Sequence, residues 1–221
     1  MSSDEFWEDP ERVERFAGRE PDHRLMALLE SYPHPGSVRV LDLGCAGGRN
    51  TELLARRGFD VWAVDAAAAM VERTRSRVAA VLGSEAASRR VRRGRMDDLS
   101  VFDDGAFHLV VSVGVQHSAR TRAEWSRAAD ETARVLRPGG LLLFTQFTPE
   151  VDLTGGGVRP VAGEPWVYEG FPAGRAVLLE AEVLDAEWGK RGLYPEVPSE
   201  TVRVDLEEGR RVSVNALYRK G

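Results

Sequence analysis

Short apolar runs alternate with helical segments between residues 38 and 147, and this alternation constrains the fold more than any other feature. Helical patterns at 50–57, 66–82 and 121–136 separate most of the runs. Because successive strand, helix and strand segments form right-handed crossovers, the pattern predicts a parallel, doubly wound α/β sheet. The apolar runs are VRVLDL from Val38, DVWAVD from Asp60, VRRGRM from Val91, FHLVVSV from Phe107 and LLLFTQF from Leu141.

Three segments of different character accompany this core within one predicted domain, residues 1–221. Residues 1–36 contain two helical patterns that end in a proline-rich turn, and they are predicted to form a helical lid. Residues 148–174 are rich in glycine, proline and aromatic residues, which favours a functional loop on the substrate side. Two alternating apolar runs flank Glu207-Glu208-Gly209 and predict a C-terminal hairpin.

The charge balance excludes several classes of partner. Thirty Lys and Arg residues face 35 Asp and Glu residues, and no long basic run is present, which argues against nucleic acid. The acidic start lacks the features of a secretory signal and no stretch is long enough to span a bilayer, so we expect a cytoplasmic protein without a membrane partner. One cysteine and four scattered histidines form no spaced ligand set, so we expect no metal.

A glycine-rich turn, GCAGG, joins the first strand to the first helix. Glycines at such a junction let backbone N–H groups and the positive end of the helix approach a ligand closely. Taken alone, the turn is compatible with an NAD-binding site, an FAD-binding site or a structural turn that only allows tight packing. Asp65 ends the second strand about twenty residues beyond Gly44, where a carboxylate accepts the two ribose hydroxyls of a bound adenosine.

The turn and the segments after it resemble class I S-adenosylmethionine (SAM)-dependent methyltransferases. VLDLGCAGGRN resembles their D-x-G-x-G-x-G signature and departs from the G-x-G-x-x-G of NAD enzymes, and RGRMDDL, FHLVVSVGVQH and RVLRPGGLLLF resemble later motifs in order. The resemblance implies a Rossmann-like three-layer sandwich whose mostly parallel, seven-stranded sheet carries an antiparallel C-terminal hairpin strand beside the fifth. The GRN triplet and the C-terminal end are also similar to tellurite-resistance-type methyltransferases.

The resemblance also implies SAM as cofactor, with Met96 near adenine and Asp97 accepting its exocyclic amine. Asp98 is an alternative for that role, Asp42 is structural or touches the methionine moiety through water, and Cys45 is a small filler rather than a nucleophile. The candidate cofactor-binding residues are Asp42, Gly44, Cys45, Ala46, Gly47, Asn50, Asp65, Ala66, Met70, Met96, Asp97, Asp98 and Ser112.

The sequence departs from the family pattern at three places. Ala46 occupies the middle glycine position, and His108 stands where the family often has aspartate. Residues 66–69 are all alanine and lack the polar cap that often follows the ribose-binding carboxylate. These departures predict weaker cofactor binding than is typical.

The proposed acceptor side centres on His117, which follows the fourth strand at the edge where open α/β sheets bind ligands. It is a candidate general base, or else a residue that packs or positions substrate. Gln116, Trp166 and Tyr168 are further substrate-binding candidates. We expect a monomer or homodimer that methylates a small molecule by direct displacement; a non-catalytic SAM-binding regulator and an NAD-dependent oxidoreductase are the alternatives.

Overall fold

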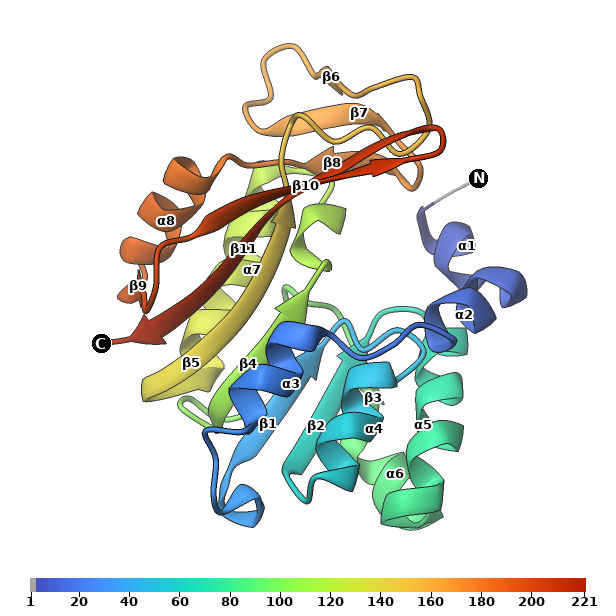
Figure 1. Cartoon of the computed structure of the whole chain (residues 1–221), viewed down its shortest axis with the longest axis vertical. Helices are drawn as coiled ribbons and strands as arrows, with labels where there is room; N and C mark the ends of the chain where they lie inside the picture. The colour runs from blue at the N-terminus through green and yellow to red at the C-terminus, as the bar shows by residue number, and fades with distance from the viewer. Residues whose placement is uncertain (1–2) are drawn as a thin grey trace.

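A mixed sheet forms the centre of the computed structural model, which describes residues 3–221 and, of the side chains, those from Phe6 onward (Figure 1). Seven strands follow the order β10-β11-β5-β4-β1-β2-β3, and β9 pairs with β11. The strands are β1 (Arg39–Leu43), β2 (Asp60–Asp65), β3 (Val91–Arg93), β4 (Phe107–Val113), β5 (Leu136–Phe147), β9 (Leu193–Pro195), β10 (Glu200–Leu206) and β11 (Gly209–Lys220).

Strand directions confirm the predicted Rossmann-like architecture. Strands β1 to β5 pair in parallel, whereas β11 runs antiparallel to β5 and β10 antiparallel to β11. The predicted C-terminal hairpin is therefore present, and its second strand lies beside β5 as the resemblance implied. Strand β9 was not predicted, because LYP is too short to give a periodic signal.

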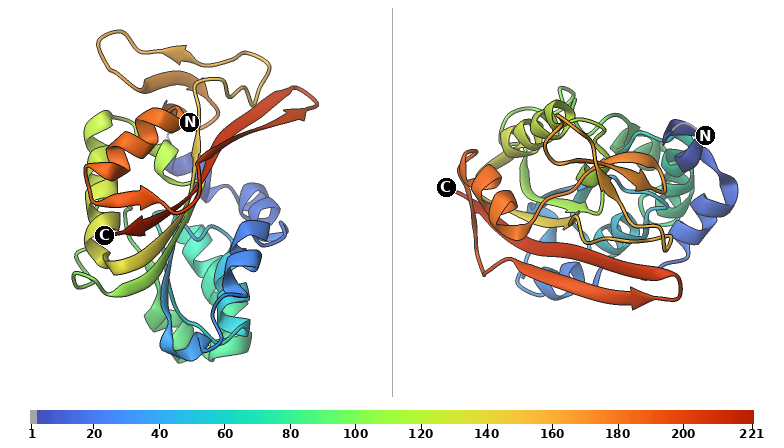
Figure 2. Two further views of the ribbon diagram at one scale, coloured as in Figure 1. Left: turned by 60° about the vertical axis from the view of Figure 1, so that its left-hand side comes forward. Right: turned by 90° about the horizontal axis from the view of Figure 1, so that it is seen from above.

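Helices cover both faces of the sheet and make three layers (Figures 1 and 2). Helices α3, α4 and α5 pack on one face, where Leu25, Leu54 and Val71 are buried. Helices α7 and α8 cover the other face with Trp125 and Trp188. The bounds are α3 (His23–Leu29), α4 (Arg49–Arg56), α5 (Ala68–Leu82), α6 (Ser84–Arg90), α7 (Arg122–Val135) and α8 (Ala181–Gly189).

The N-terminal segment forms two short helices, α1 (Ser3–Glu8) and α2 (Pro10–Ala17), before α3. Both contact α5, and Ala17 at the end of α2 packs against Gly47 of the glycine-rich turn. Residues 1 and 2 of the predicted lid lie outside the described part. The role of this segment as a lid stays a proposal.

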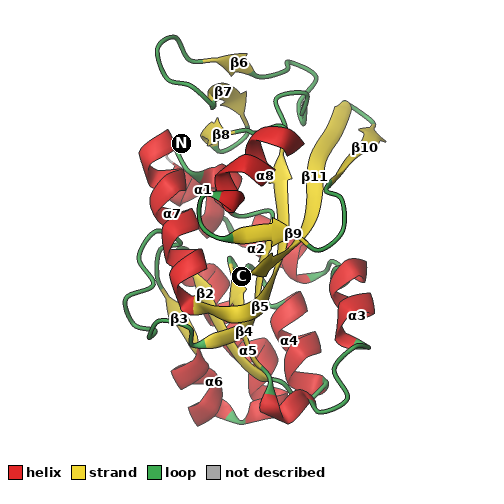
Figure 3. Ribbon diagram, turned by 90° about the vertical axis from the view of Figure 1, so that its left-hand side faces the viewer, coloured by secondary structure: helices red, strands yellow, loops and turns green. Residues whose placement is uncertain are grey.

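The segment at 148–174 is more regular than the sequence predicts. It contains β6 (Arg159–Pro160) and β7 (Val167–Phe171), which join β8 (Gly174–Val177) in a three-stranded antiparallel sheet. Figure 3 shows this sheet beyond the ends of the central strands. The sequence did not predict these strands because the segment is rich in glycine and proline. Each strand is also too short to show a clear alternation of apolar and polar residues. Phe171 packs 5.6 Å, centroid to centroid, from Phe147 at the end of β5 and holds the small sheet on the core.

Among the helices formed by residues 3–221, none combines the length and apolar character that a bilayer crossing requires.

Candidate functional site

A pocket opens at the carboxyl ends of β1, β2 and β4, the position where open α/β sheets bind ligands. Helices α1 and α2 contribute Trp7 and Phe16 to its wall, and the region before α7 contributes Ser118 and Arg120. Ten candidate cofactor-binding residues line it: Asp42, Gly44, Cys45, Ala46, Asn50, Asp65, Ala66, Met70, Met96 and Asp97.

The glycine-rich turn adopts left-handed backbone conformations. Gly44 and Gly48 have φ values of +71° and +80°, and Ala46 has +48°. For a residue with a side chain this conformation costs about 1–2 kcal/mol. Two contacts hold Ala46 in place: its N–H donates to Asp65 Oδ2 at 2.9 Å, and its carbonyl oxygen accepts from Thr74 Oγ1 at 2.6 Å.

Gly47 does not line the pocket but lets α2 pack on the turn. A Cβ atom at this position would lie 2.5 Å from both Cα and Cβ of Ala17. The carbonyl oxygen of Ala17 also accepts a hydrogen bond from Arg77 Nη1. The glycine is therefore required by the contact with the N-terminal helices, in addition to any role toward a ligand.

Asp65 lines the pocket, and backbone donors orient both of its carboxylate oxygens. Oδ2 accepts from Ala46 N, and Oδ1 accepts from Ala67 N at 3.0 Å. Burial raises the pKa of Asp65, and these hydrogen bonds act in the opposite direction. Each carboxylate oxygen offers a second lone pair, so Asp65 retains capacity to accept hydroxyl donors from the pocket.

Asp42 and Asn50 lie at the β1 side of the pocket and are both buried. Asp42 Oδ2 accepts from Thr51 Oγ1 at 2.6 Å, and burial raises the pKa of Asp42 to about 6. Asn50 Oδ1 accepts from the Asp22 N–H at 3.0 Å, which ties the segment before α3 to α4. Burial likewise raises the pKa of the Cys45 thiol, which fits the predicted filler role better than that of a nucleophile.

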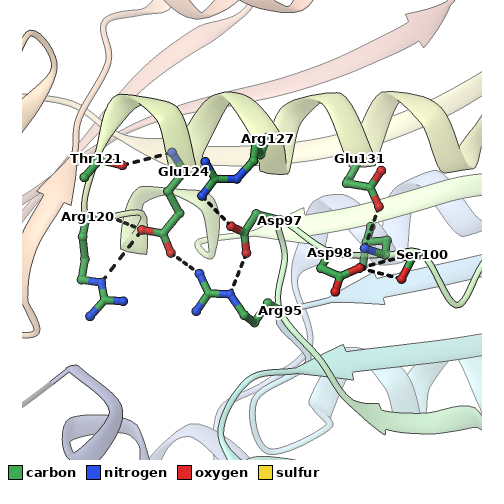
Figure 4. Close-up of polar contacts among 10 residues, drawn as sticks. Arg95, Asp97, Asp98, Ser100, Arg120, Thr121, Glu124, Arg127 and Glu131 are labelled. Carbon is green, nitrogen blue, oxygen red and sulfur yellow. Dashed lines mark hydrogen bonds and ion pairs between the residues drawn. The ribbon is translucent and has the colours of Figure 1, made fainter.

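A network of arginines and carboxylates closes the opposite end of the pocket (Figure 4). Asp97 accepts from Arg95 Nε at 2.8 Å and from Arg127 Nη2 at 3.1 Å. Glu124 accepts from Arg95 Nη2 at 2.6 Å and from the Arg120 N–H at 2.8 Å. The arginines, Arg95 first, lower the pKa of Asp97 against the opposing effect of burial, so it is a carboxylate at neutral pH. Asp97 can therefore accept a further donor from a ligand.

The neighbouring carboxylate, Asp98, is exposed and lies outside the pocket lining. Its Oδ1 accepts from the N–H and the hydroxyl of Ser100, at 3.2 and 2.7 Å. The structure thus places Asp97, and not Asp98, beside Met96 in the pocket.

Five further sequence candidates lie outside the pocket lining: Ser112, Gln116, His117, Trp166 and Tyr168. Ser112 and Gln116 are fully buried, and Gln116 Nε2 donates to Thr132 Oγ1 at 3.0 Å. Trp166 packs 6.0 Å from Trp125 and lies under the Arg122 guanidinium, so it joins the small sheet to α7. The role of Ser112 toward the cofactor and the roles of Gln116, His117, Trp166 and Tyr168 toward a substrate stay predictions.

His117 is buried in an aromatic environment. Its ring lies 4.5 Å from that of Phe147 and 5.2 Å from that of Phe171, centroid to centroid. Within the described chain its Nδ1 has no hydrogen-bond partner, and burial lowers its pKa to about 3. The neutral ring thus packs between the core and the small sheet, and the base role stays a prediction.

Several residues of the site escaped sequence reasoning, because their contacts are distant along the chain. Arg49, Arg95, Arg120 and Glu124 line the pocket. Glu124 lies in the first turn of α7. Thr121 Oγ1 accepts from the Glu124 N–H and caps this helix, while the Glu124 carboxylate accepts from the Arg120 N–H and lines the pocket.

The missing polar cap after Asp65 is supplied from another element. Glu8, at the end of α1, accepts from the N–H groups of Ala68 and Ala69 at 2.7 and 2.9 Å. The first turn of α5 is therefore capped by the N-terminal segment. Among residues 6–221, whose side chains the structure describes, we find no group of three or more His, Cys, Asp or Glu side chains arranged to hold a metal ion.

Comparison with known proteins agrees with this geometry. A family model described as a methyltransferase domain matches residues 40–140. A ubiquinone biosynthesis O-methyltransferase of Caulobacter sp. (strain K31) is 34% identical over 106 residues, 48% of this chain and 39% of that relative. Another, from Maricaulis maris (strain MCS10), is 28% identical over 192 residues, 75% of this chain and 71% of the relative. The chain thus spans well under half the length of the first relative and about seven tenths of the second.

A solved structure shares the fold over almost the whole chain. It is the Burkholderia thailandensis 1,6-didemethyltoxoflavin-N1-methyltransferase with bound 1,6-didemethyltoxoflavin and S-adenosylhomocysteine. Its TM-score is 0.64 at 19% identity, with coverage of 96% of this chain and 79% of that one.

Proposed function

Because the chain belongs to the class I SAM-dependent methyltransferase family, we propose that it transfers a methyl group from SAM to a small-molecule nucleophile by direct displacement. The observation that carries this proposal is the Asp65 carboxylate, which lines the pocket at the end of β2. Its two oxygens are fixed by Ala46 and Ala67 and keep free lone pairs, which suits the two hydroxyls of an adenosine ribose.

The two ends of the pocket suit the two ends of SAM. Met96 supplies an apolar wall and Asp97 an ionised acceptor, which fits adenine and its exocyclic amine. Asp42, Asn50 and Arg49 line the β1 side, where opposite charges suit the ammonium and carboxylate groups of the methionine moiety. The polarity of the lining thus fits the cofactor.

When bound, SAM supplies a methyl group that is already activated as part of a sulfonium. The chain's own contribution is then to orient the two reactants, and proximity of this kind supplies roughly 7–11 kcal/mol. Trp7 and Phe16 reach the pocket from α1 and α2, so a closed N-terminal segment excludes water from the donor. The small sheet formed by β6 to β8 is the proposed wall on the acceptor side.

Binding and label transfer test the proposal and separate it from its alternatives. Calorimetry on the purified chain is expected to show binding of SAM and S-adenosylhomocysteine and none of NAD. Methyl-labelled SAM with a metabolite extract is expected to yield a labelled small molecule, and phenols are the first pure acceptors to try because of the O-methyltransferase relatives. Binding of SAM without labelled product under any acceptor favours the regulator, and binding of NAD alone favours the oxidoreductase.

A further inference from the structure

The cofactor pocket has a second wall, which the proposed contacts with SAM leave unassigned. It runs from the end of β4 to the first turn of α7 and consists of Val113, Gly114, Val115, Ser118, Arg120 and Glu124. One end of this wall packs on the glycine-rich turn, because a Cβ atom on Gly44 would collide with the Val115 side chain. The other end is held by Glu124, which accepts from Arg95 Nη2 at 2.6 Å. Residues 118–120 connect these two ends and so lie beside the part of the pocket between the glycine-rich turn and the adenine end.

Arg120 lines this wall with a guanidinium that makes no hydrogen bond to the side chains or backbone of residues 6–221. Its main-chain N–H donates to Glu124 Oε2 at 2.8 Å, whereas its Nε lies 3.9 Å from the same oxygen, too far for a hydrogen bond. The other two arginines of the pocket lining are bound: Arg49 donates to the carbonyl oxygen of Glu20, and Arg95 donates to two carboxylates. Of the three, Arg120 is therefore the one that keeps all its side-chain donors for a ligand.

The charges of the network around Arg120 do not balance. Three guanidiniums meet two carboxylates: those of Arg95, Arg120 and Arg127, and those of Asp97 and Glu124 (Figure 4). Arg95 bridges both carboxylates at 2.8 and 2.6 Å, and Arg127 Nη2 lies 3.1 Å from Asp97. The remaining positive charge belongs to Arg120, whose ion pair is the longest of the four. Its side chain is 53% exposed, so water weakens this pair further.

The wall that contains Arg120 continues into the small sheet. The guanidinium of Arg122, at the start of α7, lies 4.1 Å over the ring of Trp166, and Trp166 packs on Trp125 of the same helix. The start of α7 thus joins the cofactor pocket to the small sheet, which is the proposed wall on the acceptor side. Asp65, proposed to hold the ribose, belongs to β2 and to another side of the pocket. An acceptor that enters beside the small sheet therefore meets Arg120 while the cofactor occupies its own contacts.

We propose that Arg120 determines acceptor specificity by binding a carboxylate group of the methyl acceptor, with the Ser118 hydroxyl beside it as a second donor. This rests on the proposed function and narrows its substrate class to small molecules that carry a carboxylate. A guanidinium presents two parallel N–H donors to a carboxylate, and a hydroxyl can donate to the same group. Binding at one end of the acceptor orients its nucleophile toward the methyl group. Arg49, on the β1 side of the pocket, is left for the carboxylate of SAM.

NMR of the arginine Nε–Hε signals tests this assignment, with benzoate as the anionic probe and benzamide as its neutral counterpart. The full chain is titrated with each probe, with and without S-adenosylhomocysteine, so that a failure to bind cofactor is recorded separately and counts against the proposed function alone. We expect saturable shifts of the Arg120 signal with benzoate and at least about tenfold weaker binding of benzamide. Equal affinity for the two probes, or benzoate shifts at Arg120 no larger than those at exposed Arg137, would overturn the proposal.

Variants assign the binding to the Arg120 side chain. Arg120→Gln is expected to weaken benzoate about tenfold or more, while Arg137→Gln, which removes the same charge at an exposed position outside the pocket, leaves it unchanged. The Arg120→Gln variant is expected to fold, because the main-chain N–H of residue 120 supplies the hydrogen bond to Glu124. Its affinity for S-adenosylhomocysteine is expected to stay within about twofold of wild type. Unchanged benzoate affinity in Arg120→Gln would contradict the proposal, as would a tenfold loss of S-adenosylhomocysteine affinity, since Arg120 would then serve the cofactor.

Discussion

Glu8 and Asp65 bind three consecutive backbone N–H groups at the start of α5. Asp65 Oδ1 accepts from Ala67, and the two oxygens of Glu8 accept from Ala68 and Ala69. The ribose-site carboxylate and the N-terminal segment are thereby coupled through one helix terminus. Glu8 is also a neighbouring negative charge that raises the pKa of Asp65.

Substitution Glu8→Gln tests this coupling. The amide retains one acceptor but loses the charge that interacts with the helix dipole, so unfolding free energy is expected to fall by about 0.5–1 kcal/mol. SAM affinity is expected to fall about threefold to tenfold, because neighbouring Trp7 is held less firmly at the pocket. Calorimetry and thermal denaturation measure both. Glu207→Gln removes an exposed carboxylate in the turn between β10 and β11 and should change neither; equal effects in the two variants would contradict the coupling.

Substitution Asp65→Asn is expected to weaken SAM binding about tenfold to more than a hundredfold, because the ribose hydroxyls lose a charged acceptor. The substitution also affects the glycine-rich turn. The NH₂ group of the introduced asparagine would face the N–H of either Ala46 or Ala67, and one hydrogen bond is lost, so the unfolding free energy is expected to fall too. Asp60→Asn, at the other end of β2, is the control. Unaltered SAM affinity in folded Asp65→Asn would remove Asp65 as the ribose ligand.

Periodicity predicts the parallel core because its strands are long apolar runs that need two covered faces. FHLVVSV, for example, is β4, which is buried at five of its seven positions. The small sheet of β6 to β8 was missed because it depends on tertiary contacts, among them the packing of Phe171 on His117 and Phe147 and of Trp166 on Trp125. No local pattern encodes these contacts.

Within the site, spacing along the chain predicts the residues that the βαβ unit itself brings together. Asp42, Gly44 and Asp65 follow directly from the ends of adjacent parallel strands. Glu8 meets Ala68 across 60 residues, and Arg95 meets Glu124 across 29. These contacts depend on how α1 and α7 pack on the rest of the chain. The sequence around a charged residue on a helix surface does not show which distant residue it will contact.

Asp42 predicts a pH dependence of SAM binding. Burial raises its pKa from 3.8 to about 6, so its protonated form stabilises the free chain below pH 3.8 and this contribution is lost as pH rises through 6. A methionine ammonium group beside Asp42 favours the carboxylate. SAM binding near pH 6 is therefore expected to release a proton, and SAM affinity to fall as pH drops below 6.

The number of protons released per bound SAM is measured by calorimetry in buffers of different ionisation enthalpy. Wild type is expected to release a fraction of a proton at pH 6 and almost none at pH 8. The Asp42→Asn variant lacks the part of the proton release that comes from Asp42. Any release from Asp65, whose pKa is also raised, persists in this variant. The same proton count in wild type and Asp42→Asn would show that Asp42 does not face the bound cofactor's charge.

His117 can be tested by separating its volume from its basicity. The ring fills a site between Phe147 and Phe171, so His117→Ala is expected to cost roughly 2–4 kcal/mol of stability through the cavity it leaves.

His117→Phe keeps the aromatic contacts and removes the base. Because the pKa of His117 is lowered to about 3, wild-type histidine is neutral from pH 5 to 8 and contributes no ionisation there. We therefore expect His117→Phe to retain the single-turnover rate of methyl transfer and its pH profile. A fall of about 10²–10⁴-fold in that rate, with SAM affinity unchanged, would instead establish His117 as the general base.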